Sequence, residues 1–456
     1  MKVPVALTIA GSDSGGGAGI QADLKTFAAL GVHGACAITA ITAQNTREVT
    51  GVARVEIPLL RAQIRAVAED LGVDAAKTGM LYDEEVIRAV AEEWRSVRSP
   101  LVVDPVMVAK SGARLLKEEA VRALIEELLP LATVATPNIP EAEVLSGRRI
   151  DGLEAMEEAA RSIAGLGPRA VVVKGGHRPT GSKVVNVLYW EGRFWRQELP
   201  YHETSTTHGA GCCFSAAIAA ELAKGASIER AVEAAGLLAN RAIQHGLALG
   251  GGHGPVNPLV ELYSRADELA TLQDVERAAR LLEEAGSGAL LSPECQINVA
   301  MALQYARDAM DVVAIPGRIV NVMGRLRASA PPRRGASRHL ASYLLALRPH
   351  APELRGAVNI RYSKEFIERA RALGLRVSGY DRRAEPPDVK EREGATTRWG
   401  AEQALKALGR APDVIYHEGD VGKEPMIVVL GGTATEAVRR ALRMAGLPEP
   451  SGAGTS

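Results

Sequence analysis

The chain has 456 residues, of which 46% are hydrophobic and 24% charged, and this composition is that of a folded globular protein. Lys and Arg (54) balance Asp and Glu (54), so the overall charge does not favour nucleic acid. The sequence has no apolar run near the ~18 residues of a membrane span and no signal-peptide pattern, and its four cysteines lack disulfide or zinc spacing, so we expect a cytoplasmic protein.

The length exceeds the ~250 to 300 residues at which a single core stops growing, which predicts more than one domain. In the first 265 residues, short apolar runs alternate with helical patterns. Such alternation predicts an α/β fold, with a largely parallel sheet flanked by helices. Ligands then belong at the carboxyl ends of the strands. The expected strands are Val3 to Ala10, Gly34 to Thr42, Leu101 to Val103, Thr133 to Thr136, Ala170 to Val173 and Val184 to Trp190.

Glycines follow the first expected strand, from Gly11 to Gly19. Their spacing fits neither the dinucleotide fingerprint nor the P-loop, because Gly17 occupies the place of the P-loop lysine. We interpret the segment as backbone that closes over a small substrate, with a flexible turn as the alternative. Further on, Gln44 offers an amide that both donates and accepts, which suits a heteroaromatic ring.

Polar side chains follow three later strands. Asp104 ends one of them, Asn138 and Glu141 stand three residues apart at a helix start, and Lys174 follows another on a glycine-rich bend. Carboxylates near a phosphate site hold Mg²⁺ directly or through water. The alternative for Asn138 and Glu141 is a capping box.

The segment from Thr206 to Ser215 reads Thr-Thr-His-Gly-Ala-Gly-Cys-Cys-Phe-Ser and leads into a helix-forming run. Unpaired N–H groups at a helix start, here Gly209 to Cys212, suit an anion. Cys212 lies in the first turn, where we expect a thiol pKa below its free value of about 8.5. The alternative is a small buried cysteine in an Ala-rich helix.

The motifs "AGSDSGGGAGIQADLKT", "TAQNT", "VVDPVMVAKSG", "TPNIPEAEVL", "VKGGH", "HGAGCCFSAAI" and "GHGPVN" occur in this order. Together they resemble the hydroxymethylpyrimidine and hydroxymethylpyrimidine-phosphate kinases of thiamin biosynthesis, members of the ribokinase-like superfamily. The resemblance covers roughly residues 1–263. It implies an ATP- and Mg²⁺-dependent phosphoryl transfer made twice, first to the hydroxymethyl group and then to the monophosphate.

The resemblance also implies roles for individual residues. Cys212 would be the general base, where sugar kinases of the superfamily have Asp. Ala210 and Cys213 depart from the usual Gly-Thr-Gly-Cys-Thr pattern, but the backbone donors survive both changes. The remaining roles are pyrimidine binding by Gly11, Asp23, Gln44 and Met80, and an anion hole of Gly209, Ala210 and Gly211. Asp104, Asn138, Glu141 and Lys174 would be associated with ATP and Mg²⁺, with indirect Mg²⁺ binding through Glu141 and Asp104 and ATP binding by Lys174.

A Gly- and Pro-rich stretch over residues 250–257 precedes a charged helical pattern. We therefore expect a first domain over 1–265, a helical linker over 266–289, a second α/β domain over 290–446 and a flexible tail over 447–456. Within the second domain, Val299 to Met310 is predicted to be an amphipathic helix.

Basic residues crowd the region from Ile315 to Arg361, with Glu353 as the only acid. The arginines could bind phosphate, bind nucleic acid or form a solvated face. Few aromatics and no helix-turn-helix or finger motif stand against nucleic acid. The basic residues are Arg318, Arg325, Arg327, Arg333, Arg334, Arg338, Arg348, Arg355 and Arg361.

Two segments in that region are more specific. Ile315-Pro-Gly-Arg318-Ile-Val is followed by Gly335-Ala-Ser-Arg-His339-Leu-Ala-Ser342, where a helix is predicted to begin near Ser337. With "AVNIRY", "DRRAEP", "KEREGATTRWG" and "PDVIYHEGDVGKEPMIVVLG", they resemble the ThiN-type thiamin-phosphate synthase over roughly residues 290–445. The resemblance implies that Arg318 and His339 are the catalytic pair.

Other polar residues of this half have open roles. Asp420 and Glu424 are either magnesium or substrate contacts or parts of a structural turn. Glu393 and Trp399 have no assigned role, and neither have the cysteines Cys213 and Cys295.

The prediction is a bifunctional enzyme that phosphorylates hydroxymethylpyrimidine twice and couples the product to hydroxyethylthiazole phosphate. Two alternatives stay open: a pyridoxal-type kinase in the first half, and a thiamin-phosphate-sensing module in the second. The expected partners are small molecules, with no nucleic acid or membrane. By analogy with the kinases, we expect a homodimer.

Overall fold

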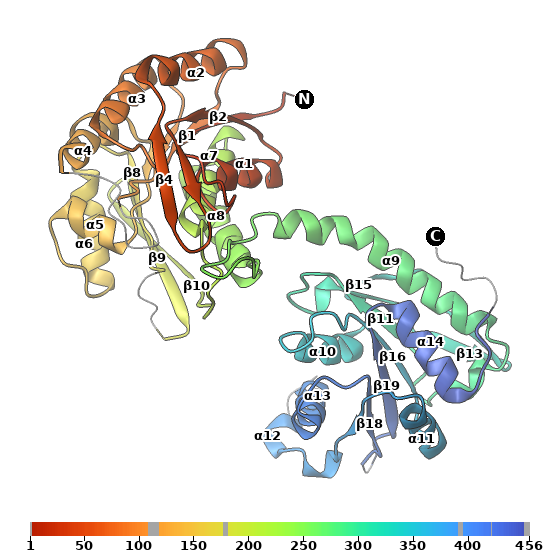
Figure 1. The fold of residues 1–456 in the computed structure, drawn as a ribbon. Coiled ribbons are helices and arrows are strands. Elements are labelled where there is room, and N and C mark those ends of the chain that lie inside the picture. The colour runs from red at the N-terminus through yellow and green to blue at the C-terminus, as the bar shows by residue number, and fades with distance from the viewer. Residues whose placement is uncertain (1, 108–117, 177–180, 391–394, 421, 451–456) are drawn as a thin grey trace. The chain divides into compact units, whose positions relative to one another are not determined.

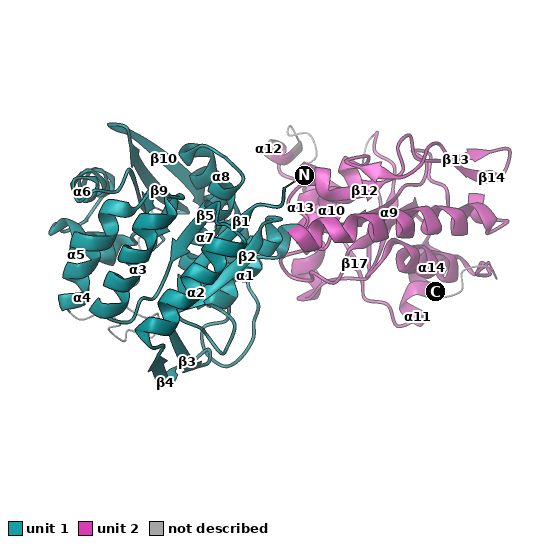
Figure 2. Cartoon of the chain, turned by 90° about the horizontal axis from the view of Figure 1, so that it is seen from above, with its two compact units in different colours: residues 1–261 teal, residues 262–456 magenta. Residues whose placement is uncertain are grey.

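A computed structural model describes residues 2–107, 118–176, 181–390, 395–420 and 422–450. The chain forms two compact units, Met1–Glu261 and Leu262–Ser456 (Figure 2). Within the described ranges, no helix has both the length and the apolar character that crossing a bilayer would require.

An eight-stranded sheet in the order β10-β9-β8-β7-β6-β5-β1-β2 forms the centre of the first unit. The six strands β2, β1, β5, β6, β7 and β8 run parallel, whereas β9 and β10 form an antiparallel hairpin at one edge. The confirmed prediction of a largely parallel sheet places the carboxyl ends of four motif-bearing strands, β1, β6, β7 and β8, at one edge. The strands are β1 (Val5–Ala10), β2 (His33–Ile38), β5 (Ala75–Thr78), β6 (Leu101–Val103), β7 (Val134–Ala135), β8 (Ala170–Val173), β9 (Lys183–Trp190) and β10 (Arg193–Pro200).

Helices cover both faces of this sheet (Figure 1). Helices α2 to α6 lie on one face, and α1, α7 and α8 pack together on the other. The helices are α1 (Gly19–Ala29), α2 (Ile57–Asp70), α3 (Glu84–Val97), α4 (Glu118–Ala123), α5 (Ile139–Ser146), α6 (Leu153–Ala164), α7 (Ala210–Ala223) and α8 (Ile228–Gln244), with a π-helical turn (Leu124–Leu128) and a 3-10 turn (Leu129–Leu131) after α4.

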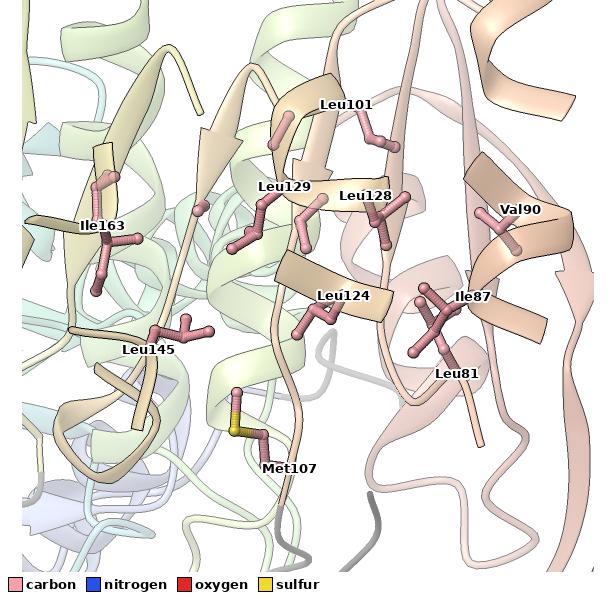
Figure 3. Close-up of a cluster of buried hydrophobic side chains, with 14 of the residues drawn as sticks. Leu81, Ile87, Val90, Leu101, Met107, Leu124, Leu128, Leu129, Leu145 and Ile163 are labelled. Atoms are coloured by element: carbon pink, nitrogen blue, oxygen red, sulfur yellow. The ribbon is translucent and has the colours of Figure 1, made fainter. Parts of the chain in front are cut away.

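The two faces of β1 differ in chemistry because successive side chains point to opposite sides. Leu7 and Ile9 enter a large apolar core shared with α2 to α6, part of which is shown in Figure 3. Thr8 points to the other face, towards Asp23 of α1. The large cluster that contains Leu7 and Ile9 lies on one side of the sheet. The side of α1 and α7 also buries apolar residues such as Phe27 and Ile218, and it holds the buried polar groups.

The predicted strand Gly34 to Thr42 is wrong in its extent. The chain bends at Thr39, whose N–H donates to the Ala10 carbonyl and whose hydroxyl donates to the Met80 carbonyl. Strand β3 (Ala40–Gln44) therefore leaves the main sheet and pairs with β4 (Val49–Arg54) in a separate hairpin. Gln44 lies near the turn of this hairpin.

The second unit has a seven-stranded, mostly antiparallel sheet in the order β15-β12-β11-β16-β19-β18-β17, with only β17 and β18 parallel. A small β13-β14 hairpin accompanies it. The strands are β11 (Val299–Ala302), β12 (Val312–Ala314), β13 (Ile319–Val322), β14 (Arg325–Ala328), β15 (Arg333–Arg334), β16 (Gly356–Arg361), β17 (Val377–Gly379), β18 (Val414–His417) and β19 (Met426–Gly431).

Two layers of helices enclose this second sheet. One apolar core includes residues of α9, α11 and α14, and the other includes residues of α10 and α13. Helix α9 contains most of the expected linker 266–289 and contributes Val275, Ala278 and Leu282 to the first of these cores. The helices are α9 (Val260–Glu284), α10 (Arg338–Leu347), α11 (Lys364–Ala372), α12 (Pro387–Lys390), α13 (Ala395–Leu408) and α14 (Ala434–Ala445), with 3-10 turns at Gly288–Leu291, Ala309–Asp311 and Arg382–Ala384.

The predicted amphipathic helix over Val299 to Met310 is wrong. Residues Val299–Ala302 form strand β11, which lies between β12 and β16 and is buried on both faces. A short apolar run of this kind has the same periodicity in a buried strand as in a buried helix. The predicted helix start near Ser337 is confirmed, because the Ser337 side chain accepts from the Leu340 N–H.

Candidate active sites in the two units

The glycine-rich loop after β1 is organised by Asp13, a residue that the sequence did not single out. Its carboxylate accepts the N–H groups of Gly15, Gly17 and Ala18 at 2.8 to 3.0 Å, and it lies 2.9 Å from His208 Nε2. Burial opposes ionisation, but the hydrogen bonds from His208 and Ala18 hold the pKa of Asp13 below its ordinary value. An Asp followed by glycines is a turn signal that could have identified it.

Residues of the expected pyrimidine site gather around this loop. Gln44 Nε2 lies 3.3 Å from His208 Nε2, and the backbone N–H of Gln44 donates to Ser14. A Cβ at Gly11 would lie 2.4 Å from the Met80 side chain. The structure thus brings Gln44 beside the loop, and Met80 against Gly11.

Asp23 is fully buried on α1, where it accepts from Thr8 (2.6 Å) and from Lys77 (2.9 Å). Lys77 is also fully buried, on β5. Burial would lower the pKa of Lys77, but the charges of Asp23, Cys212 and Asp104 raise it above its ordinary value. This ion pair could not be predicted, because a lone lysine in Ala-Ala-Lys-Thr has no distinguishing pattern.

The expected anion hole lies at the start of α7. Gly209 has a φ of 80°, and a Cβ there would lie 1.8 Å from the Gly17 carbonyl oxygen, so only glycine fits. The Ala210 N–H donates to the Thr207 carbonyl at 3.3 Å. The glycine-rich loop and the start of α7 are therefore in direct contact.

Cys212 lies between the starts of two helices, since the Gly19 N–H at the start of α1 also hydrogen-bonds to its thiol. The prediction of a lowered thiol pKa is wrong for the protein without ligands. Burial raises the pKa of Cys212 to about 11, although the charge of Lys77 acts in the opposite direction. Desolvation exceeds the effect of the helix dipoles here.

Cys213, the next residue, is fully buried and faces Thr26 of α1. Burial raises the pKa of this thiol to about 12. Its position in the contact between α1 and α7 gives it a packing role.

The strand-end residues of the ATP motifs also meet. Asp104 accepts from Lys174 Nζ at 2.8 Å and from the Thr136 and Ser215 hydroxyls at 3.2 Å. A Cβ at Gly211 would lie 3.4 Å from Lys174 Nζ and 3.7 Å from Asp104 Oδ2. Lys174 and Asp104 therefore flank the start of α7.

Asn138 and Glu141 form the capping box that was the structural alternative, with reciprocal hydrogen bonds of 2.8 and 2.9 Å. Glu141 does more than cap, because burial and the charge of Asp104 raise its pKa to about 7 against the opposing charge of Lys174. A buried carboxylate that binds its proton so strongly is one that a cation would stabilise.

In the described part of the chain, no three His, Cys, Asp or Glu side chains form a ready metal cluster. Asp104 and Glu141 nevertheless fit Mg²⁺, which uses one or two carboxylates together with waters and substrate phosphates. The rest of the "VVDPVMVAKSG" motif after Met107, and His177 of "VKGGH", lie outside the described residues.

The second site lies at one edge of the second sheet. Strand register places the carboxyl ends of β12, β16, β17 and β18 at the same edge as the starts of β11 and β19. Arg318 follows β12, and its guanidinium donates to the Cys295 carbonyl at 2.6 Å. Its backbone has a φ of 73°, a left-handed conformation that is costly for a residue with a Cβ.

His339 lies in the first turn of α10 with its ring edge-on to Tyr343, at 5.4 Å between centroids. Burial, with the charges of Arg318 and Arg382, lowers the pKa of His339 to about 4. The charge of Arg318 acts on His339, so the structure brings the two residues of the expected catalytic pair close together. His339 is neutral at physiological pH in the ligand-free protein.

Several arginines of the basic region have structural partners. Arg334 pairs with Asp311, Arg355 pairs with Asp267, and the Arg348 guanidinium donates to backbone carbonyls. Arg361 stacks over the Phe366 ring. The region is thus in part an internal ion-pair network and not a continuous basic face.

Glu424 has a structural role in this unit, since it accepts the N–H groups of Glu294 and Cys295. It thereby fixes the carbonyl of Cys295 that holds Arg318. Asp420 forms a backbone turn with Lys423. Trp399 packs edge-on against Tyr380, and Glu393 lies outside the described residues.

Two family models match the chain in succession. The model described as phosphomethylpyrimidine kinase matches residues 13–257, and the model described as thiamine-phosphate synthase ThiN matches residues 274–443.

Curated relatives match the first half. The hydroxymethylpyrimidine/phosphomethylpyrimidine kinase of Bacillus subtilis is 48% identical over 260 residues, covering 56% of this chain and 95% of that protein. The thiamine biosynthesis bifunctional protein ThiED of Geobacter sulfurreducens is 49% identical over 255 residues, covering 56% of this chain and 52% of that protein.

A solved structure matches the same half. The ADP complex of Bacillus subtilis pyridoxal kinase has a TM-score of 0.53 and 41% identity, covering 57% of this chain and all of that one.

Proposed function

Because this chain belongs to the phosphomethylpyrimidine kinase family and continues into a ThiN-type domain, we propose how its residues divide the work of making thiamin phosphate. The first unit is a hydroxymethylpyrimidine and phosphomethylpyrimidine kinase, and the second is a thiamin-phosphate synthase. One observation carries the assignment of residues: in each unit, the motif residues from distant segments meet at one edge of the sheet.

In the kinase unit, the start of α7 receives the transferring phosphoryl group. The N–H groups of Gly209 and Gly211 and the positive end of the helix dipole stabilise the charge on the phosphoryl oxygens, whereas the Ala210 N–H already donates to the Thr207 carbonyl. Lys174, beside Gly211, holds an ATP phosphate. Asp104 and Glu141 would hold Mg²⁺, whose charge would offset that of the ATP phosphates.

The pyrimidine lies against the glycine-rich loop, with Gly11, Gln44 and Met80 around it. Asp23 is buried beneath, where Lys77 holds it in place. Cys212 takes the proton of the hydroxymethyl group. With a thiol pKa of about 11 in the ligand-free site, Cys212 transfers protons only after substrates and metal have changed its surroundings, which restricts ATP consumption to the filled site.

In the synthase unit, the diphosphate of the pyrimidine leaves as the nitrogen of hydroxyethylthiazole phosphate attacks the methylene carbon. The pyrimidine ring is electron-rich and stabilises positive charge on that carbon. Catalysis therefore consists of holding the departing anion and excluding water. Arg318 supplies positive charge, and neutral His339 donates a hydrogen bond.

The test of the synthase uses the full chain supplied with pyrimidine diphosphate and thiazole phosphate, without ATP. Thiamin phosphate should form, and Arg318→Ala and His339→Ala should each lower its rate by about 10²- to 10³-fold while leaving pyrimidine phosphorylation intact. Binding of both precursors without product in the wild type would mean that the second unit is a sensing module.

A second candidate substrate for the kinase unit is a pyridoxal-type ring. The similarity to Bacillus subtilis pyridoxal kinase, which extends over that whole protein, favours it. Competing phosphorylation of hydroxymethylpyrimidine and pyridoxal by one preparation decides between them. We expect the pyrimidine to have the higher kcat/KM, and a preference for pyridoxal would reverse the assignment.

The assembly and location are also proposals. We expect a homodimer, which light scattering on the purified chain tests. We place the protein in the cytoplasm, where thiols such as Cys212 stay reduced.

A further inference from the structure

A continuous set of side-chain contacts extends from His339 across the second site. The His339 ring meets Tyr343, the Tyr343 hydroxyl lies 2.8 Å from the Tyr380 hydroxyl, and the Tyr380 ring lies 5.3 Å from the His417 ring. These residues come from α10, from the end of β17 and from the end of β18. Because β17 and β18 are parallel, Tyr380 and His417 reach the same edge of the sheet.

Arg382 follows Tyr380 by two residues, in a short 3-10 turn. Its Nε is buried, and it has no hydrogen-bond partner within the part of the chain that the structure describes. The charge of Arg382 acts on all four residues of this set of contacts, which are His339, Tyr343, Tyr380 and His417. A buried guanidinium N–H without a partner is costly, so it indicates a ligand that supplies the acceptor.

Arg383, the next residue, behaves in the opposite way. Its side chain is 77% exposed and pairs with Asp381 at 2.9 Å. The two arginines therefore have the same charge and adjacent positions in the sequence, but their environments differ.

His417 is 3% exposed, and its orientation fixes its tautomer. The Gly419 N–H donates to His417 Nδ1 at 3.3 Å, so the proton of the neutral ring is on Nε2. Burial, with the charges of Arg382 and His339, lowers the pKa of His417 to about 4. At physiological pH, His417 is therefore a neutral hydrogen-bond donor.

We infer that Arg382 and His417 bind the diphosphate of the pyrimidine substrate and, with Arg318 and His339, complete the site for the leaving group. The inference deepens the proposed synthase function and rests on it. During the reaction, the thiazole nitrogen lone pair forms the C–N bond, and the C–O bond breaks with its electron pair passing to the diphosphate oxygen. Two guanidinium groups and the Nε2–H of His417 then hold that added charge without any proton transfer.

One nearby group opposes an anion. Glu385 is 6% exposed, and its charge acts on Tyr380 in the opposite direction to that of Arg382. Like Arg382 Nε, Glu385 Oε1 is buried without a hydrogen-bond partner in the described residues. A carboxylate that neutralises Arg382 also repels an anion, so Glu385→Gln should strengthen diphosphate binding if Arg382 faces that anion. The experiment must therefore measure anion binding and not activity alone.

The test is calorimetric titration of inorganic diphosphate into the full chain, comparing Arg382→Ala with Arg383→Ala. We expect Arg382→Ala to weaken one class of diphosphate sites by about tenfold or more, and Arg383→Ala to change affinity less than about twofold. Arg382→Lys, which keeps the charge but loses the planar fork, should fall between wild type and Arg382→Ala. His417→Phe should also weaken this class of sites, whereas His417→Gln, which keeps a donor, should weaken it less.

Thermal unfolding and pyrimidine kinase activity of each variant show that both units remain folded. If Arg382→Ala unfolds the second unit, the Arg382→Lys and His417→Gln titrations carry the test. Equal diphosphate affinity in the Arg382 and Arg383 variants, or in all variants of a folded chain, overturns the inference. Diphosphate binding that depends on Arg382 in a wild type that forms no thiamin phosphate would instead overturn the synthase function and leave the anion site standing.

Discussion

The two units manage buried charge differently. In the kinase unit, Lys77 pairs with Asp23, and Lys174 pairs with Asp104, both at the centre of the site. In the synthase unit, Arg318 donates to the backbone carbonyls of Cys295 and Gln296. Arg382 has a buried N–H without a partner in the described residues. The first site is thus neutralised before substrate arrives, whereas in the second we propose that the diphosphate supplies negative charge to Arg318 and Arg382.

The difference follows from what each site must bind. The kinase site receives ATP, whose phosphates come with a metal cation, so an excess of protein cations is not needed there. In the proposed reaction, the synthase site must stabilise a diphosphate as it departs, and the planar guanidinium groups of Arg318 and Arg382 match its oxygens. Breaking a charge contact should therefore cost stability in the first unit and activity in the second.

The largest effect is expected from Cys212→Ala. Loss of the base should lower the first phosphoryl transfer by about 10²- to 10⁴-fold, and the second transfer less, because the monophosphate is already an anion. Initial rates with the pyrimidine and with its monophosphate measure both steps. Because the ligand-free thiol has a raised pKa, the wild-type rate should increase with pH where a Cys212→Ser rate does not. Full activity of Cys212→Ala in both transfers would remove the thiol from the mechanism.

Lys77→Met tests the neutralised pair in the kinase unit. Removing one partner leaves the other charge buried, so the first unit should lose about 3–5 kcal/mol of unfolding free energy. Denaturant unfolding of the full chain measures the loss. The matched control is Lys183→Met, which breaks the exposed Lys183–Glu198 pair and should cost less than about 1 kcal/mol.

A Lys77→Met cost no larger than the Lys183→Met cost would show that the buried pair does not hold the site. The double variant Lys77→Met with Asp23→Asn should recover part of the loss, because no charge is then left without its partner.

The pH dependence of stability should differ in sign between the units. His339 and His417 have a pKa of about 4 when folded and 6.5 when unfolded. Their contribution is complete above the unfolded value and is lost as pH falls towards 4, because the unfolded chain takes up protons first. Cys212 and Cys213 have raised pKa values of about 11 and 12, so their contribution is complete below the unfolded value of 9.0 and is lost as pH rises above it.

Thermal unfolding from about pH 4 to 11 of wild type, His417→Phe and Cys213→Ala checks this. In His417→Phe, the unfolding temperature of the second unit should fall less at acid pH than in the wild type. In Cys213→Ala, that of the first unit should fall less at alkaline pH. The exposed His350 provides a control, since His350→Phe should leave the fall at acid pH unchanged. An equal fall at acid pH in His417→Phe and wild type would show that the imidazole is not held neutral by the fold.

The smallest effect concerns the backbone of Arg318. With a φ of 73°, glycine is the favoured residue there, so an arginine is retained for its side chain. The unfolding free energy of Arg318→Gly should exceed that of Arg318→Ala by about 1 kcal/mol, and denaturant unfolding measures the difference. Both variants lose the coupling reaction. Equal stability of the two variants would mean that the left-handed backbone is not strained.

The sequence predicted the first unit well because parallel strands deliver their carboxyl ends to one edge. Asp104, Asn138, Lys174 and the start of α7 could therefore be expected together from order alone. The sequence did not reveal Lys77, because neither its burial nor its partner on α1 follows from local pattern. It misjudged the pKa of Cys212, because burial depends on how α1 and α7 pack.

The second unit was less predictable because its sheet is mainly antiparallel and its site is built from loops and strand ends far apart in the chain. Resemblance identified Arg318 and His339, but Arg382 and His417 lie in motifs whose letters do not distinguish them from surface residues. Arg383 has the same side chain as Arg382, and only the fold separates the two. The apolar run at Val299 was assigned to a helix because its periodicity cannot identify a fully buried strand.

The most direct test supplies the full chain with hydroxymethylpyrimidine, ATP, Mg²⁺ and thiazole phosphate in one vessel. The wild type should form thiamin phosphate, and Arg318→Ala should stop at the pyrimidine diphosphate. Cys212→Ala should make little product until pyrimidine diphosphate is added. A wild-type chain that accumulates pyrimidine diphosphate beside unreacted thiazole phosphate would contradict the account.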